Sequence, residues 1–163
     1  MNHEIKLGKL KAMASEVTVV PDYWIANYPG QHNCQQYCLD CCEKHIAGLE
    51  KGVHTPERDD RVEEPIPLSE EDKLSVVENP PHVDGGWGSE YDNLPVCSTC
   101  DAPLSGSLTD MAVSEELSHH LEVNEGSVLV ASPRKAWELE SVISNASCEH
   151  QASVELLIEK LSF

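Results

Sequence analysis

The sequence has few of the residues that build a large hydrophobic core. Among its 163 residues there are one phenylalanine, three tryptophans and four tyrosines. Leucine, isoleucine, valine and phenylalanine together account for 38 residues, not far above the level of about 20% below which highly charged chains tend to be disordered. We therefore expect the fold to need a stabilising element besides apolar packing.

Basic residues are also scarce. The chain has 11 lysine and arginine residues against 29 acidic residues, and its net charge is −18. Proteins bind nucleic acids largely by neutralising phosphates with lysine and arginine, so direct nucleic-acid binding is disfavoured. Such acidity either keeps a protein soluble or attracts a basic partner. Because solubility alone asks for a charge of about 2–8 in magnitude, we expect a basic protein partner.

Long apolar runs are missing as well. No run approaches the ~18 residues of a membrane-spanning helix, and no hydrophobic stretch of the signal-peptide type follows Met1. We therefore expect a cytoplasmic protein without a membrane segment, in a compartment that keeps thiols reduced.

Signatures of several enzyme classes are absent. The single His-x-Glu, at His120 and Glu122, follows the second cysteine pair, whereas a zinc deaminase needs it before that pair. The glycines after Asp84 lack the Gly-Lys-Ser/Thr end of a phosphate-binding loop. Adjacent His119 and His120 would diverge by about 100° on a helix, so we expect a solvated face there. A binding protein is favoured over an enzyme.

What the sequence does contain is seven cysteines, six of them in two clusters. Cys38 and Cys41 have two residues between them, as do Cys97 and Cys100. Two such pairs are typical of a structural zinc site, because a tight turn at each pair directs both sulfurs to one ion. A disulfide framework is disfavoured by the odd number of cysteines and the reducing compartment. We predict that these four cysteines hold a structural zinc ion, which would add folding energy.

Two other residues are alternative ligands. Cys34 could replace Cys38 if the first turn begins earlier in the chain. His45 lies four residues after Cys41, so on a helix it could reach the same ion.

We divide the chain into three segments of one structural domain. Residues 1–52 contain a short helix or frayed arm over 4–16, a strand at 17–20 and a helix over 38–52 that carries the first cysteine pair. Residues 53–84 form an acidic, proline-rich linker with a short helix from Ser69 through Val77. Residues 85–163 contain the second pair and a helical region. The predicted fold class is α+β, with a small zinc-centred N-terminal unit, an acidic linker and a helical C-terminal part.

Apolar periodicity supports several of these helices. On the helix over 38–52 we expect Cys42 to be buried on one face with Leu39, Ile46 and Leu49. In the C-terminal part, Thr109 begins a helix over 110–121 and Ser132–Pro133 begins another. The last helix, over 147–161, has a complete apolar stripe of Val154, Leu157, Ile158 and Leu161.

The acidity and the zinc site together suggest a function. We expect a non-enzymatic, zinc-stabilised acidic binding protein that engages a basic protein, for example an inhibitor that mimics nucleic acid, as in phage or mobile-element counter-defence. The clustered aromatics Tyr23, Trp24 and Tyr28 are either core residues or partner-binding anchors. Two alternatives stay open, namely a metal-dependent hydrolytic enzyme with an open zinc position and a zinc-assisted nucleic-acid-binding regulator. The oligomeric state is left open.

Overall fold

The chain forms two compact units in a computed structural model, which describes residues 1–30, 35–56, 64–86, 89–123 and 126–163. Unit 1 consists of Met1–Thr18, Glu90–Leu94 and Gly106–Phe163. Unit 2 consists of Val19–Ser89 and Pro95–Ser105. Helices occur together with short two-stranded sheets, so the predicted α+β class is confirmed.

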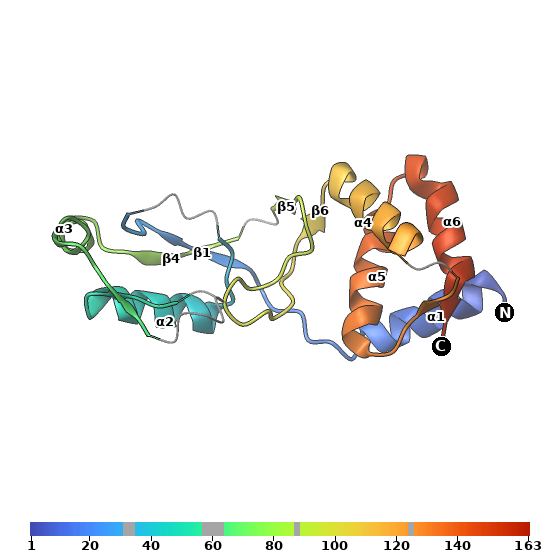
Figure 1. The fold of residues 1–163 in the computed structure, drawn as a ribbon, viewed down its shortest axis with the longest axis horizontal. Helices are drawn as coiled ribbons and strands as arrows, with labels where there is room; N and C mark the ends of the chain where they lie inside the picture. The colour runs from blue at the N-terminus through green and yellow to red at the C-terminus, as the bar shows by residue number, and fades with distance from the viewer. Residues whose placement is uncertain (31–34, 57–63, 87–88, 124–125) are drawn as a thin grey trace. The chain divides into compact units, whose positions relative to one another are not determined.

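Unit 2 is built around one long helix and a small antiparallel sheet (Figure 1). Strand β1 (Tyr23–Ala26) pairs with β4 (His82–Gly85), and α2 (Leu39–Glu50) contacts both strands. Beyond the end of α2, β2 (Val53–His54) pairs with β3 (Ile66–Pro67), and α3 (Glu70–Glu78) follows. The pairing of β1 with β4 thus brings together residues that are far apart in the chain.

The helix α2 lies where the sequence predicts one, and of its predicted apolar face Cys42 and Leu49 are buried whereas Leu39 is not. It ends before Gly52, whose φ of 81° suits the left-handed turn that follows a helix. Leu39 is 41% exposed, which is a correction to the apolar face expected from periodicity. The face that is buried carries Cys41, Cys42, His45, Gly48 and Leu49. Cys41 on this face belongs to the four-cysteine cluster described below.

One further expectation needs correction. The strand expected at 17–20 is absent, since within this span only Val20 forms an isolated bridge, to Leu104. Where the structure describes it, the segment 53–84 contains β2, β3 and the beginning of β4. The helix expected from Ser69 is confirmed as α3, with the Ser69 hydroxyl accepting a hydrogen bond from the Asp72 N–H. Residues 57–63 of this segment lie outside the described residues.

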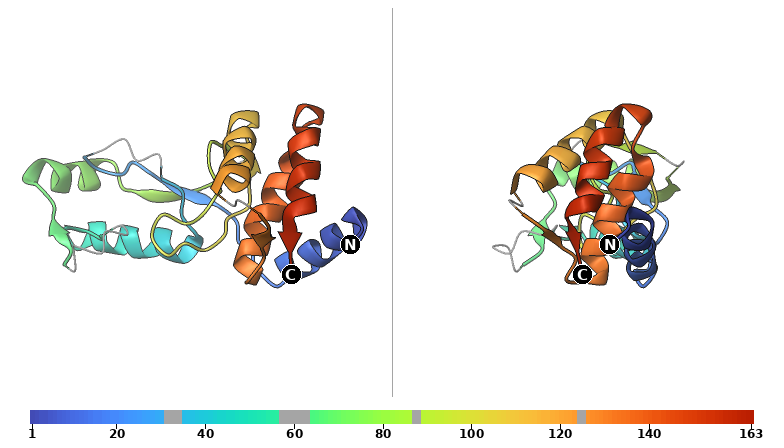
Figure 2. Two further views of the ribbon diagram at one scale, coloured as in Figure 1. Left: turned by 45° about the vertical axis from the view of Figure 1, so that its right-hand side comes forward. Right: turned by 90° about the vertical axis from the view of Figure 1, so that its right-hand side faces the viewer.

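Unit 1 is mainly helical (Figures 1 and 2). Its elements are α1 (His3–Ala14), β5 (Glu90–Tyr91), β6 (Ser107–Leu108), α4 (Asp110–Val123), β7 (Val128–Leu129), α5 (Pro133–Asn145), a 3₁₀ turn (Cys148–His150), α6 (Gln151–Lys160) and β8 (Leu161–Ser162). Helix α1 contacts α5 and α6, and α4 also contacts α5 and α6. Short parallel pairs join β5 to β6 and β7 to β8.

The helices of unit 1 begin at the caps that the sequence indicates. Ser132 accepts a hydrogen bond from the Lys135 N–H, with Pro133 at the first helical position. The Thr109 hydroxyl accepts from the Ala112 N–H at the start of α4. In the predicted stripe of the last helix, Val154, Leu157 and Ile158 are buried on α6, and Leu161 is also buried but begins β8.

Both units are strongly acidic. Unit 1 has fourteen acidic and six basic residues, a net charge of −8, and unit 2 has fifteen acidic and five basic residues, a net charge of −10. Residues 1–52 are nearly neutral as a segment. This segment is divided between the two units, however, and each unit as a whole carries a net negative charge.

Candidate metal centre

The four cysteines of the two Cys-x-x-Cys pairs come together in unit 2. Cys38 directly precedes α2, Cys41 lies in its first turn, and Cys97 and Cys100 occupy a tight turn after residue 95. Their sulfur atoms all lie within 4.8 Å of one another, so the group could hold a metal ion. The sequence spacing predicted this set of four.

Backbone hydrogen bonds shape both turns. The Asp101 N–H donates to the Cys97 carbonyl at 3.0 Å, and the Cys97 N–H donates to the Ala102 carbonyl at 2.9 Å. Asp101 has a φ of 60°, which lets the chain reverse after Cys100. At the first pair, the Cys42 N–H donates to the Cys38 carbonyl as α2 begins. Backbone hydrogen bonds thus hold the turn at each cysteine pair in place.

Peptide N–H groups also point at the sulfurs. The Cys41 N–H donates to the Cys38 sulfur. The N–H groups of Cys100, Cys38 and Thr99 donate to the Cys97 sulfur. Hydrogen bonds of this kind stabilise thiolates, the form in which cysteine binds metals.

The spacing of Cys38 and Cys100 suits a tetrahedral thiolate site. The Cys38 and Cys100 sulfurs are 3.7 Å apart, and a tetrahedron with metal–sulfur bonds of about 2.3 Å has edges of about 3.8 Å. A disulfide would need about 2.05 Å, and all four cysteines are free thiols. The donor set and its spacing therefore suit a metal ion that prefers four sulfur ligands.

The pKa values of the four thiols vary with their surroundings. Burial raises the pKa of Cys38 and of Cys41. Burial also acts on Cys97, but the N–H groups that donate to its sulfur outweigh it and lower its pKa. A bound divalent cation would displace the remaining protons and offset two of the four thiolate charges.

The neighbouring cysteines stand apart from this group. Cys42 is fully buried, as predicted, and burial raises its pKa to about 12, so it remains a neutral thiol. Cys34, the alternative ligand, lies outside the described residues.

His45 lies beside the four-cysteine cluster and is not one of its four members. Its side chain is fully buried, its ring centroid is 4.8 Å from that of Tyr37, and its Nε2 lies 2.8 Å from the Thr99 hydroxyl. Because Thr99 lies between Cys97 and Cys100, this contact attaches α2 to the second cysteine turn. Sequence reasoning missed Thr99 and Tyr37, since no local signal relates them to His45.

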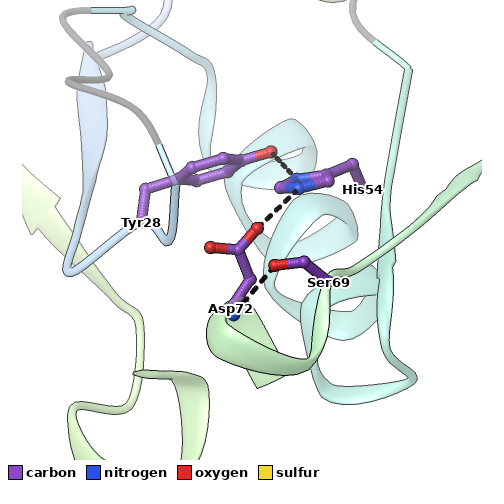
Figure 3. Close-up of polar contacts among 4 residues, drawn as sticks. All are labelled: Tyr28, His54, Ser69 and Asp72. Atoms are coloured by element: carbon purple, nitrogen blue, oxygen red, sulfur yellow. Dashed lines mark hydrogen bonds and ion pairs between the residues drawn. The ribbon is translucent and has the colours of Figure 1, made fainter. Parts of the chain in front are cut away.

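A second polar cluster in unit 2 links three other elements (Figure 3). The Tyr28 hydroxyl lies 3.3 Å from His54 Nδ1, and the two rings are stacked with centroids 5.8 Å apart. His54 Nε2 lies 3.9 Å from an Asp72 carboxylate oxygen, which is too long for a hydrogen bond. Because the imidazole is not held by the carboxylate as in a catalytic triad, the cluster is best described as a structural link between the turn after β1, β2 and α3.

The three clustered aromatic residues lie in different surroundings. Tyr23 is half-buried against the core of unit 2, and its backbone pairs with Tyr37. Tyr28 is half-buried against His54 and His45. Trp24 is 48% exposed on β1. Of the three, Trp24 is the most accessible to a partner.

Unit 1 contains a serine–histidine pair that geometry makes unsuitable for catalysis. The Ser114 hydroxyl lies 2.7 Å from His150 Nε2, the distance expected of a nucleophile and its base. However, the Ser147 N–H donates to His150 Nδ1. A neutral ring must then carry its proton on Nε2, so Nε2 cannot accept the Ser114 proton.

The pair His119–His120 is only partly on a solvated face, which corrects the sequence expectation. His119 is exposed, but the His120 side chain is buried, with its Nε2 3.6 Å from a Glu116 carboxylate oxygen. Burial, with lesser effects of the Lys135 and His119 charges, lowers the pKa of His120 from 6.5 to about 4. The ring is thus neutral in the folded protein near neutral pH.

This pKa predicts that acid weakens unit 1. The unfolded chain gains a proton at His120 below pH 6.5, whereas the folded chain does not until about pH 4, so the free energy of unfolding falls as the pH falls between these values. The His120 contribution is at most about 3 kcal/mol. Denaturant unfolding across this range should show a steeper loss of stability for the wild type than for His120→Gln. Acid-induced metal loss affects both proteins equally, so identical pH profiles would contradict the prediction.

None of the helices in the described parts of the chain is long and apolar enough to cross a membrane. Comparison with known proteins finds no matching family model, no similar curated protein and no similar solved structure.

Proposed function

We propose that the protein is a non-enzymatic, zinc-stabilised binding protein whose acidic surface engages a basic protein. The observation that carries this proposal is the cluster of four cysteine sulfurs within 4.8 Å. Four sulfur ligands are the donor set of structural zinc sites, whereas catalytic zinc keeps a position for water. This favours a structural ion over the alternative of an open hydrolytic centre.

The composition of the unit 2 core supports a structural role for zinc. Among the described residues, a core cluster of unit 2 contains three cysteines among its six buried residues, namely Ile25, Tyr37, Cys41, Cys42, Cys97 and Leu104. A cysteine buries less apolar surface than the larger aliphatic side chains that usually fill such positions. A bound zinc ion would add folding energy that this core does not supply by itself.

The charge supports a basic partner. Both units are negative, so long-range attraction would steer a positively charged surface toward either of them. A nucleic-acid-binding protein presents such a surface, and an acidic protein that occupies it would act as an inhibitor. The same charge disfavours the other alternative, a regulator that binds nucleic acid itself.

The identity of the metal is tested on the purified protein. We expect one zinc ion per chain by elemental analysis. Cobalt substitution should give the absorption of a tetrahedral four-thiolate site. A spectrum typical of mixed ligands with bound water would instead favour the enzyme alternative.

The partner is tested by affinity capture from native-host extract at low and at high salt, followed by identification of the captured protein. We expect a basic nucleic-acid-binding protein that is retained at low salt and released at high salt, because screening weakens charge attraction. The captured protein's own nucleic-acid binding should then be inhibited by addition of this protein. Capture that is indifferent to salt, or capture without inhibition, would contradict the proposal.

A further inference from the structure

The outer face of the β1–β4 sheet carries an exposed tryptophan next to a carboxylate. Trp24 lies directly opposite Asp84 in the antiparallel register, so both side chains project from the same face. Residues opposite one another in such a pair have Cβ atoms about 4.5–5.5 Å apart. The next pair on this face of the sheet is Ala26 opposite His82.

This face is not the one that packs on the core. Ile25, between Trp24 and Ala26, is buried in the core of unit 2 together with the half-buried Val83 opposite it. Trp24 points the other way and keeps 48% of its surface exposed. The Asp84 carboxylate takes part in none of the ion pairs of the described residues. Trp24 is thus exposed to another molecule, and the half-buried Asp84 carboxylate lies beside it without a charged partner among the described residues.

We infer that Trp24 and Asp84 form an anchor site for an arginine side chain of the basic partner, an inference that rests on the proposed function. An indole face attracts a cation placed over it. The Asp84 carboxylate on the neighbouring strand can accept hydrogen bonds from the same cation. The net charge of −10 on unit 2 favours this occupant over an anionic or apolar one.

Arginine suits the site better than lysine. Its planar guanidinium can stack on the indole ring while its N–H groups reach the carboxylate. A lysine ammonium is a compact, strongly hydrated charge that cannot stack in this way. The site is thus expected to distinguish two peptides of equal charge, which a diffuse acidic surface would not do.

The test measures binding of two short labelled peptides to the full-length protein, one with alternating arginine and serine and one with alternating lysine and serine. We expect the arginine peptide to bind more tightly. Trp24→Val and Asp84→Asn should each weaken it about tenfold, in line with the strength of a cation–π contact or a hydrogen-bonded ion pair. Valine and asparagine leave the strand pairing in place, and unchanged metal content and circular dichroism verify the fold.

Two matched variants serve as controls. Glu71→Gln removes one exposed acid from the same unit, and Phe163→Val removes a 43% exposed aromatic ring from unit 1. Both should change the affinity less than twofold, as expected for surface positions outside the site.

The outcomes separate this inference from the proposed function. If both peptides bind equally and Asp84→Asn acts no more strongly than Glu71→Gln, the anchor site is refuted while a general acidic surface remains. If neither peptide binds at low salt, the anchor site is also refuted, and salt-dependent capture of the native partner then decides the proposed function separately.

Discussion

Replacement of Cys97 by serine is expected to abolish metal binding and to unfold unit 2. A structural zinc ion contributes about 10–16 kcal/mol to the folding of small zinc domains, which is as large as the whole stability of a typical domain. Cys97 is fully buried, and a serine hydroxyl does not ionise near neutral pH to an anionic ligand as a thiol does, so serine cannot replace it. Elemental analysis should find no bound metal, and hydrogen exchange should show lost protection in α2, β1 and β4.

Two variants control this result. Cys148 is an exposed, free cysteine in unit 1, so Cys148→Ser should leave metal content and folding unchanged. His45→Gln keeps a polar group that can reach Thr99 and should also retain the metal, because His45 is not one of the four clustered residues. A Cys97→Ser protein that keeps its metal and its unit 2 protection would show that the ligand set is wrong. Loss of metal in His45→Gln would add His45 to it.

The second large effect is expected in unit 1, where Leu157→Ala should lower the free energy of unfolding by about 2–5 kcal/mol. Leu157 lies on α6 and is 0% exposed, within a core that consists of apolar side chains without the cysteine cluster. Removing its buried carbons leaves a cavity that the packed helices fill only in part. Denaturant unfolding monitored by circular dichroism, with hydrogen exchange to locate the change in α1, α4 and α5, measures the loss.

The adjacent residue is a matched control. Leu156 has the same side chain on the same helix but is 43% exposed, so Leu156→Ala should change stability by no more than about 0.5 kcal/mol. Both variants should bind metal like the wild type, since the metal centre belongs to unit 2. Equal effects of the two substitutions would contradict the placement of α6.

Several features of the fold follow from local sequence, and the reason is the short range of the forces involved. The stripe Val154, Leu157, Ile158 and Leu161 repeats with the period of a helix. Ser132–Pro133 and Ser69 cap helices through contacts within three residues. The two Cys-x-x-Cys turns form through local backbone hydrogen bonds.

Where sequence reasoning failed, contacts between distant residues overrode local pattern. Periodicity alone placed Leu39 on the buried face of α2, but Cys41 of the four-cysteine cluster is buried and Leu39 is exposed. The run at 17–20 has the composition of a strand, yet the partner strand β4 pairs with Tyr23–Ala26 instead. His120 reads as part of a polar face, but packing of α4 buries it.

The sequence by itself therefore determined which helices form, which four cysteines could share an ion, and how acidic the protein is, because residue type and short spacing suffice for these. Only the tertiary structure decided which distant residues are in contact. It placed His45 against Thr99, 54 residues away, and Trp24 opposite Asp84. It also gathered Met1–Thr18 and the C-terminal helices into one unit. These contacts depend on how whole helices and strands pack and pair, and the local periodicity of the sequence does not indicate that packing.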